Sequence, residues 1–480
     1  MARSPILRRS DVSLYNQVEG LIKNWITDGT LLAGSRIPSV RAMSKKLSVS
    51  ISTVNQAYAL LEAQGHIEAK PQSGYFVKRL TMVNTPAFKS KAMPTPRFVK
   101  DSSRNLDIVH SCSNEKLVPL GGAVIHTSLL PTMSLQKSLL KVMRQEPVKA
   151  MRYAPLGGIY ELRKEISKRT FDAGYVVDPE QVIITNGCTE ALNLALKSCT
   201  SPGDIVAVES PTFHGILRLI EDQGLKLLEL PATSDKGIDL EAFAEKASKF
   251  KIKAALVTPN FLNPIGSLMS DENKEKFVQL CYKHNITIVE DDIYGELYFT
   301  PTRPLTLKSF DKQDKNYLCS SFSKTLSAGY RIGWVIPPES EKEKVLLFKS
   351  TNTSSTNAAL QMAIADHLAN HSYERHLRKL RQTIEKNFTL ITATIQKHFP
   401  EDIKITHPRG GCLIWIEFAP STNTLDLFEK ALKKNISVVP GCAFSSTGKY
   451  MNCLRINAGV AWSSEIEKAL IEIGNLAKTC

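Results

Sequence analysis

The sequence lacks three features that would restrict the class of protein. Its 480 residues contain no run of about 18 uncharged apolar residues, the length that a bilayer-spanning helix needs. The first residues, MARSPILRRS, have no apolar stretch after their basic residues, which argues against a secretory signal. The nine cysteines are scattered and form no C-x-x-C pair, which argues against a disulfide framework and a structural zinc site. We therefore expect a soluble, cytoplasmic protein without a metal.

Acidic residues are scarce at the N-terminal end. Residues 1–100 hold 15 Lys and Arg against 5 Asp and Glu, whereas the remaining residues hold 46 against 42. Most of the net charge of +14 therefore lies in the first 100 residues. A basic head on a nearly neutral body favours a polyanionic partner, although a solubilising tail would carry the same charge.

The basic head has the pattern of a winged helix-turn-helix. Apolar residues recur at helical spacing from Leu14 to Ile26, and further helices are expected from Pro38 to Leu47 and from Ile51 to Ala63. Two short strands, 66–70 and 75–77, follow around a turn at 71–74. Small polar side chains at the start of the third helix suit a helix that enters the DNA major groove. Capping and solvation of the helix are the alternative roles for the same side chains.

The head resembles the winged-helix domains of the GntR family of bacterial regulators. The resemblance lies in LLAGSRIPSVR (31–41), VSISTV (49–54), Gly65 and SGYFV (73–77). It implies that DNA is contacted by Arg41, Ser50, Ser52, Thr53 and the wing at Ser73 and Gly74. Asn55 and Gln56 are further candidates for reading base edges. Some members of the family have arginine where this chain has Ile51 and Asn55, so the phosphate contacts carry over more directly than the base contacts.

The remaining chain alternates strand-like and helix-like segments. Residues 1–80 form the expected head, 81–104 an extended basic linker with three prolines, and 105–480 a large body. In the body, the alternation indicates an α/β fold with a mostly parallel sheet covered on both faces. The expected strands are 182–185, 205–208, 254–258, 286–289, 317–320 and 333–336, and the expected helices include 189–197, 213–223 and 273–283.

Residues whose side chains can bind or react with a ligand follow several of these strands. An open α/β sheet binds its ligands at these strand ends. NGCTEAL after 183–185 opens a helix whose free N–H groups suit a phosphate. An Asn-Pro-x-Gly turn, three acids at 290–292, and a lysine between hydroxyl residues follow the other strands. An aromatic aldehyde phosphate needs a lysine, a carboxylate for its ring nitrogen and a phosphate cradle. The combination therefore predicts a pyridoxal 5'-phosphate site.

The body closely resembles the fold type I pyridoxal-phosphate enzymes of aminotransferase class I/II, with a large domain and a smaller C-terminal α+β domain from about residue 345 to 480. The resemblance implies that Lys324 forms the Schiff base and that Asp291 bonds the ring nitrogen, with Glu290 and Asp292 fitting the spacing less well. It implies further cofactor contacts from Tyr294, Asn263, Phe213, Cys188, Thr189, Ser321, Ser323 and Arg331. Tyr153 would reach the phosphate of a neighbouring subunit in a homodimer, and Arg455 would take the carboxylate of an amino compound.

Head and body together resemble the MocR subgroup of GntR regulators. The favoured hypothesis is a transcriptional regulator that binds double-stranded operator DNA and senses pyridoxal phosphate, an amino-acid or amine effector, or both. The alternative is a metabolic aminotransferase with an accessory head, and the residues for transamination are present. The sequence does not name the effector, the operator or the sign of regulation.

Overall fold

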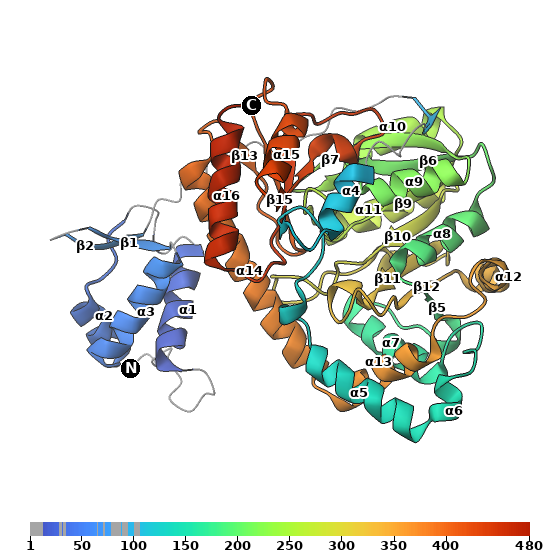
Figure 1. The fold of residues 1–480 in the computed structure, drawn as a ribbon, viewed down its shortest axis with the longest axis horizontal. Helices are drawn as coiled ribbons and strands as arrows, with labels where there is room; N and C mark the ends of the chain where they lie inside the picture. The colour runs from blue at the N-terminus through green and yellow to red at the C-terminus, as the bar shows by residue number, and fades with distance from the viewer. Residues whose placement is uncertain are drawn as a thin grey trace. The chain divides into compact units, whose positions relative to one another are not determined.

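The computed structural model describes residues 13–27, 31, 35–64, 66–70, 73–77, 88, 95–99 and 106–480 (Figure 1). The chain divides into two compact units, residues 1–86 with 389–393 and the remainder, which we describe separately. Gly65, the turn residues 71–72 and most of the 81–104 linker lie outside the described residues. No described helix is long and apolar enough to cross a membrane.

The head has three helices followed by a two-stranded wing. One apolar face of each helix builds its core, which includes the fully buried Val54 and Tyr58. Tyr58 donates its hydroxyl to the Pro38 carbonyl at 2.6 Å, which ties the third helix to the start of the second. The elements are α1 (Leu14–Thr27), α2 (Val40–Leu47), α3 (Ile51–Ala63), β1 (Ile67–Lys70) and β2 (Gly74–Val77).

The body is built on a nine-stranded, mostly parallel sheet. Its strands follow the order β3-β7-β6-β9-β10-β11-β12-β5, with β8 paired to β7. Of these, β12 runs antiparallel to both neighbours and β3 runs antiparallel to β7. The strands are β3 (Arg97–Phe98), β5 (Ile183–Thr185), β6 (Ile205–Ser210), β7 (Lys226–Thr233), β8 (Gly237–Ile238), β9 (Ile252–Val257), β10 (Thr287–Asp291), β11 (Asn316–Ser321) and β12 (Gly333–Ile336).

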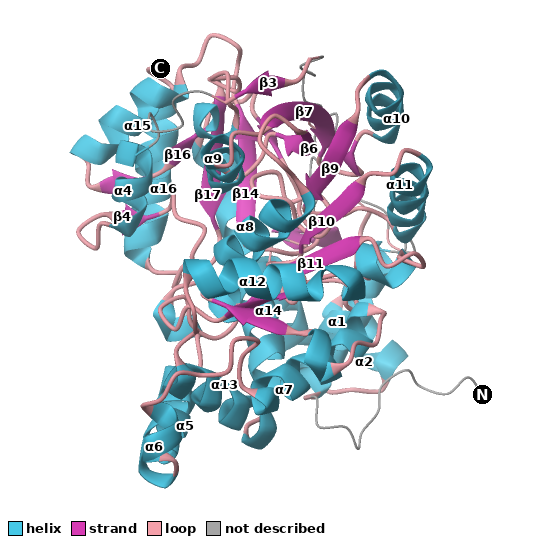
Figure 2. Cartoon of the chain, turned by 90° about the vertical axis from the view of Figure 1, so that its right-hand side faces the viewer, coloured by secondary structure: helices cyan, strands magenta, loops and turns pink. Residues whose placement is uncertain are grey.

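Helices cover both faces of this sheet, as Figure 2 shows. One face packs on α8 (Cys188–Cys199), α9 (His214–Asp222) and α12 (Lys342–Asn352). The other face packs on α10 (Leu240–Lys249) and α11 (Asp271–Lys283). The central strands are buried on both sides, which explains their continuous apolar runs. The α/β fold expected from the sequence is therefore confirmed.

The C-terminal part contains a second, smaller sheet with the order β13-β14-β17-β16. Its strands are antiparallel, and helices accompany them. The strands are β13 (Lys404–Ile405), β14 (Leu413–Glu417), β16 (Val439–Pro440) and β17 (Cys453–Asn457), and β15 (Ile436–Ser437) pairs separately with β4 (Val118–Pro119). The remaining helices of the body are α4 (Leu106–Ser113), α5 (Thr132–Gln145), α6 (Pro147–Ala150), α7 (Tyr160–Thr170), α13 (Ala358–Asn370), α14 (Tyr373–His398), α15 (Thr424–Lys433) and α16 (Ser464–Ala477).

A buried carboxyl group joins two central strands. Glu209, at the end of β6, is 1% exposed, and its two oxygens accept the Thr258 amide after β9 at 3.1 and 3.0 Å. Burial raises the pKa of Glu209 to about 8. Between pH 4.5 and pH 8 the folded chain therefore holds a proton that the unfolded chain has released. The contribution of the protonated Glu209 to the free energy of unfolding is fully present below the unfolded pKa of 4.5. It is lost as the pH rises through the folded pKa of about 8.

The variant Glu209→Gln keeps an acceptor for Thr258 and cannot ionise. Relative to this variant, the wild type should lose on the order of a few kcal/mol of unfolding free energy between about pH 5 and pH 8. Urea unfolding of the cofactor-free protein across this range measures the difference. Glu275→Gln, at an exposed position of α11, is the control and should follow the wild type. If the unfolding free energies of Glu209→Gln and the wild type changed in parallel with pH, Glu209 would not be protonated in the folded chain.

Candidate functional site

Lys324 lies directly after the central strand β11, in the 3-10 turn Phe322–Lys324. Its Nζ donates to the Ala123 carbonyl at 2.5 Å and lies 5.7 Å from the centre of the Tyr294 ring. Burial is the main reason that the pKa of Lys324 is lowered. The lower pKa favours the neutral amine, which is the form that attacks an aldehyde carbon.

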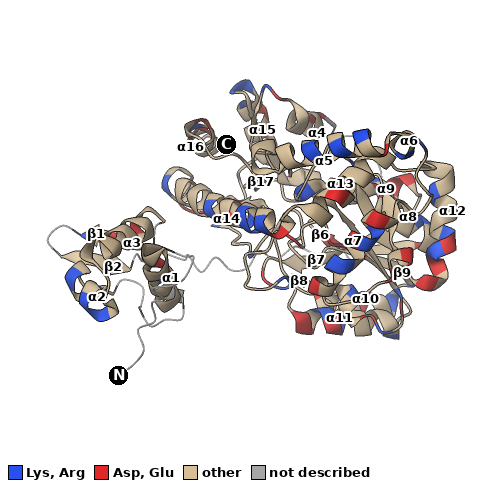
Figure 3. Cartoon of the chain, turned by 90° about the horizontal axis from the view of Figure 1, so that it is seen from below, with Lys and Arg blue, Asp and Glu red and all other residues tan. Residues whose placement is uncertain are grey.

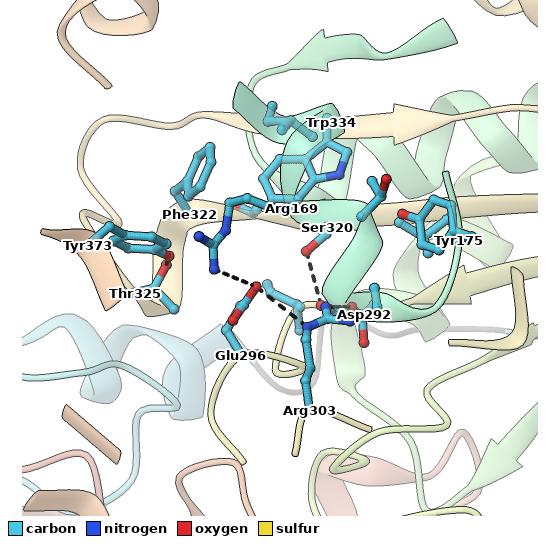
Figure 4. A pocket seen from close by; sticks show the side chains of 16 residues that line it. Arg169, Tyr175, Asp292, Glu296, Arg303, Ser320, Phe322, Thr325, Trp334 and Tyr373 are labelled. Atoms are coloured by element: carbon cyan, nitrogen blue, oxygen red, sulfur yellow. Dashed lines mark hydrogen bonds and ion pairs between the residues drawn. The ribbon is translucent and has the colours of Figure 1, made fainter. Parts of the chain in front are cut away.

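Two of the three acids at the end of β10 face away from Lys324. Glu290 accepts the amides of Leu307 and Lys308 at 2.7 and 3.0 Å. Asp292 forms an ion pair with Arg303 at 2.5 Å and lines a small cavity that also contains Glu296 (Figure 4). Both carboxylates thus already have cationic or amide partners, so neither is available to a ligand near Lys324.

Asp291 points the other way, because successive residues of a strand face opposite sides of the sheet. Its Oδ1 accepts the Cys188 thiol at 3.3 Å and the Ile293 amide at 3.1 Å. Burial raises the pKa of Asp291 to about 6, while the hydrogen bond from Cys188 works against that rise. The carboxyl is therefore mostly ionised at neutral pH and can hold a protonated ring nitrogen.

The start of α8 forms an open anion site. Gly187 precedes the helix at φ +86 and supplies no side-chain cap, so the first N–H groups, including those of Cys188 and Thr189, have no acceptor within the helix. A Cβ on Gly187 would lie 2.4 Å from a terminal nitrogen of Arg331, so glycine lets the guanidinium approach. Arg331 donates to the Asn186 carbonyl at 3.0 Å.

Two serines border the same place. Ser321 and Ser323 share a hydroxyl hydrogen bond of 2.7 Å, and both are buried. Ser321 pairs with Gly333 across β11 and β12, and Gly333 packs directly against Gly187. Backbone N–H groups, two hydroxyls and a guanidinium therefore gather at the start of α8, and together they have the chemistry that suits a phosphate dianion.

Arg455, in β17, is 2% exposed and reaches the Lys324 region from the small sheet. One terminal nitrogen donates to Asn263 Oδ1 at 3.0 Å and the other donates to the Gly121 carbonyl at 2.5 Å. The guanidinium lies over the Phe444 ring, 4.9 Å from its centre. Burial lowers the pKa of Arg455. Both of its acceptors are neutral, so no anion compensates the guanidinium charge and a ligand carboxylate could do so.

Phe213 and Tyr153 lie differently from the other predicted residues. Phe213 immediately precedes α9 and packs against the core that contains Cys188. Its ring is tilted by 60° against that of His214, with ring centres 4.4 Å apart. Tyr153 is 90% exposed between α6 and α7, and the single chain does not bring it to Lys324. Its exposed side chain is accessible to another molecule.

Several residues near the site were missed from the sequence. Burial and Arg455 lower the pKa of His214 to about 4, so this imidazole is neutral beside Phe213. Burial raises the pKa of Cys412 to about 11, although Lys324 and Arg455 oppose the shift. His214 directly follows the predicted residue Phe213, and this adjacency was the available signal, whereas Cys412 follows no predicted residue.

The turn that carries Lys324 is also held from α14. Tyr373 donates its hydroxyl to Thr325 Oγ1 at 2.7 Å, and His376 Nε2 lies 2.7 Å from the Thr325 carbonyl. These contacts fix the residue after Lys324. Within the described part of the chain, no group of three or more His, Cys, Asp and Glu side chains could hold a metal ion.

The head presents a separate exposed polar face. Ser50 caps α3 by accepting the Thr53 amide at 3.0 Å, and its hydroxyl lies 2.7 Å from those of Ser52 and Thr53. Arg41, Asn55, Gln56 and Ser73 are exposed. Figure 3 shows Lys and Arg gathered on α2, whose sequence VRAMSKKL contains no acid. Capping and an accessible polar face thus coexist at the start of α3.

The wing brings an arginine to its tip. Gly74 has φ +94, and a Cβ there would lie 3.4 Å from a terminal nitrogen of Arg36. Arg36 forms a strand-like bridge to Phe76 beside β2. Its side chain adds a cation beside Ser73 and Gly74 that the list of predicted DNA contacts did not include.

Two families match the chain. Aminotransferase class I and II matches residues 129–473, and the gntR family of bacterial regulatory proteins matches residues 14–77. The chain is 35% identical to the uncharacterized HTH-type transcriptional regulator YjiR and 32% identical to YdcR, both of Escherichia coli strain K12. Each alignment covers 96% of this chain and 98% of the relative.

Solved aminotransferases share the fold of the body. The α-aminoadipate aminotransferase LysN of Thermus thermophilus, complexed with N-(5'-phosphopyridoxyl)-L-leucine, aligns with a TM-score of 0.73 and 25% identity over 80% of this chain and 96% of its own. The kynurenine aminotransferase of Pyrococcus horikoshii has the same TM-score and identity over 79% and 94%. The chain belongs to the aminotransferase class I and II family and has the MocR-type architecture, in which a gntR-type head precedes an aminotransferase-like body.

Proposed function

We propose that the protein is a transcriptional regulator that binds DNA through its winged helix and uses its body to sense pyridoxal phosphate, an amino compound, or both. The observation that carries the proposal is the presence of a basic DNA-binding head and of the residue set around Lys324 in one chain. The regulator names of YjiR and YdcR, which align over nearly their whole length, support it.

The cofactor is pyridoxal phosphate, which when bound joins a lysine covalently and acts as an electron sink for an amino compound. Lys324 supplies the amine, and Asp291 holds a proton on the ring nitrogen. Tyr294 and Asn263 would bond the ring hydroxyl, and Phe213, whose ring packs beside His214 in this chain, would stack on the cofactor ring. The N–H groups at Cys188 and Thr189, with Ser321, Ser323 and Arg331, bind the phosphate.

The signal arises at Arg455. A carboxylate that arrives there must replace the bonds to Asn263 and Gly121, so the empty and filled sites differ in their contacts. A ligand regulates only through such a difference in affinity between two states. The second candidate, a metabolic aminotransferase, is favoured by the same residues but leaves the basic face of α2 unexplained.

We also propose that the body forms a homodimer. The exposed Val148, Met151 and Tyr153 gather at α6 and the following loop, beside a groove of about 640 Å³. A contiguous exposed apolar patch commonly marks an interface between proteins. A second copy on this face would let Tyr153 reach the phosphate site of its partner.

The central experiment follows the cofactor and DNA affinity together. Borohydride should fix the cofactor on Lys324 in the wild type, and mass spectrometry should find no fixed cofactor in Lys324→Ala. Aminooxyacetate, which captures the cofactor aldehyde and carries a carboxylate, should change wild-type DNA affinity by about 5- to 150-fold. DNA affinity in Lys324→Ala should not respond through displacement of the lysine.

Lys312→Ala, at an exposed position, is the control and should behave as the wild type. Labelling of another lysine in the wild type would overturn the assignment of Lys324. A wild type that captures aminooxyacetate without any change in DNA affinity would instead favour the metabolic aminotransferase.

The second experiment tests the head. Arg41→Ala should weaken binding to all DNA sequences and reduce the slope of log affinity against log salt by about one, because one phosphate contact is lost. Gln56→Ala should instead change the preference at particular bases by about 1–3 kcal/mol. Arg218→Ala, on the exposed side of α9, should leave both unchanged. Specific binding by a chain without residues 1–80 would refute the role of the head.

The third experiment tests the exchange of Tyr153 between subunits. Loss of one hydrogen bond to a charged phosphate in Tyr153→Ala should weaken cofactor retention by about 1.5–3 kcal/mol. Mixed dimers of Tyr153→Ala and Lys324→Ala should regain one complete site, because the intact Tyr153 of one subunit serves the intact Lys324 of the other. Phe171→Ala, another exposed aromatic, is the control. A monomer with full cofactor occupancy would contradict the dimer.

A further inference from the structure

The chain between head and body is fastened to the body at Phe88. Its side chain is only 9% exposed, and its ring centre lies 6.0 Å from that of Trp415 and 5.8 Å from that of Tyr450. The Phe88 carbonyl accepts the Ser234 amide at 3.3 Å, at the end of β7. An aromatic side chain buried in this way contributes both apolar area and ring–ring contact.

A second anchor lies at Arg97. Its guanidinium forms an ion pair with the buried Glu229 and donates to Ser446 Oγ at 2.7 Å. Glu229 also accepts the hydroxyls of Ser445 and Ser446 at 3.2 Å each. Removing Arg97 would leave a buried carboxylate without its cation, which makes this anchor difficult to release.

Both anchors contact one stretch of the body, Gly441–Tyr450, which we call the 441–450 segment. Phe88 contacts it at Tyr450, and Arg97 contacts it at Ser446. Arg97 and Phe98 also extend the large sheet as β3, so the second anchor is continuous with β7. The 441–450 segment is therefore held between the interdomain chain and the core of the body.

The opposite side of the 441–450 segment reaches the predicted ligand site. Phe444 lies under the Arg455 guanidinium and packs on Trp415 with ring centres 5.4 Å apart. The Phe444 carbonyl accepts the Thr212 amide at 3.0 Å, immediately before Phe213. Trp415 and Arg455 are also direct partners across β14 and β17.

Phe88 and Arg455 thus share Trp415, and the 441–450 segment connects both anchors to Phe444. In a close-packed interior, a shift of one ring requires its neighbours to move. A carboxylate that takes over Arg455 changes the contacts of a guanidinium resting on Phe444. The altered packing therefore reaches Phe88, which lies two residues after Pro86, the last residue of the head unit before the body.

We propose that Phe88 and Arg97 are positioning residues for the carboxylate site, holding Arg455 in place through Trp415 and the 441–450 segment. The same contacts link ligand binding at Arg455 to the segment that leads to the head. This part of the proposal rests on the proposed regulatory function. The interdomain chain is thereby a structural part of the ligand site.

The experiment compares two reagents on the full-length, cofactor-loaded protein. Aminooxyacetate and O-methylhydroxylamine both displace Lys324 by forming a C=N bond from their aminooxy nitrogen, with no oxidant or reductant consumed. Only aminooxyacetate carries a carboxylate for Arg455. The ratio of their apparent affinities, followed by the cofactor spectrum, therefore reports the contribution of Arg455 without any DNA.

Phe88→Ala and Arg97→Ala should each lower this ratio by about tenfold while capture of O-methylhydroxylamine persists. Arg455→Ala should abolish the preference and sets the lower limit. Phe98→Ala is the matched control, because Phe98 belongs to the same segment, is 51% exposed and has Lys226 over its ring, 5.4 Å from the ring centre. Phe88→Leu, which keeps an apolar side chain, should restore most of the preference and excludes a folding defect as the cause.

An unchanged ratio in both Phe88→Ala and Arg97→Ala would overturn the positioning role. A second readout uses a DNA fragment selected from a random pool by the wild type. Aminooxyacetate should change its affinity in the wild type and in Phe98→Ala, and the change should shrink at least severalfold in Phe88→Ala. A lowered ratio with no DNA response in the wild type would support the positioning role and reject the proposed regulatory function. A full DNA response in Phe88→Ala would overturn the transmission.

Discussion

The buried guanidinium of Arg455 contacts three separate parts of the body. Arg455 meets Asn263 from the loop after β9, Gly121 from the chain after β4, and Phe444 from the 441–450 segment. A guanidinium in an interior of low dielectric constant is tolerated only while its hydrogen bonds and packing persist. Arg455 therefore connects the small sheet, the loop after β9 and the N-terminal part of the body. The same guanidinium is suited to bind a ligand carboxylate. A carboxylate bound at Arg455, as proposed, would compete directly with the hydrogen bonds to Asn263 and Gly121.

The end of β10 shows how a run of acids is divided between structure and chemistry. Glu290 and Asp292 face one side of the strand, where backbone amides and Arg303 satisfy them. Asp291 faces the other side and meets a thiol in place of a cation. Its carboxylate thus lacks a permanent countercharge, which is the condition under which a cationic ring nitrogen binds strongly. Alternation along one strand separates the two tasks without additional residues.

Much of this arrangement could be predicted from the sequence, because the informative patterns are local. The strands near Lys324, the helix start at Cys188 and the three helices of the head follow from short-range periodicity and capping. The choice of Asp291 rested on spacing from Tyr294, and the structure places that carboxyl on the side facing Lys324. Pairing between distant segments was not predictable. The smaller C-terminal domain was expected, but its strand order, the antiparallel direction of β12 and the partners of Phe88 depend on residues far along the chain. His214 and Cys412 acquire their surroundings only through that packing.

The packing of Phe88 on the body affects where a head from one protein can be joined to the body of another, during evolution or in the laboratory. A junction placed before Phe88 exchanges the complete head and retains every contact described for the body. A junction placed after Val99 removes both Phe88 and Arg97 and leaves Glu229 buried without its cation. Two chimaeras with the same head and the same aminotransferase-like body could therefore differ in how well the ligand site is assembled. If Phe88 and Arg97 have the proposed role, the boundary to preserve lies upstream of residue 129, where the aminotransferase family match begins.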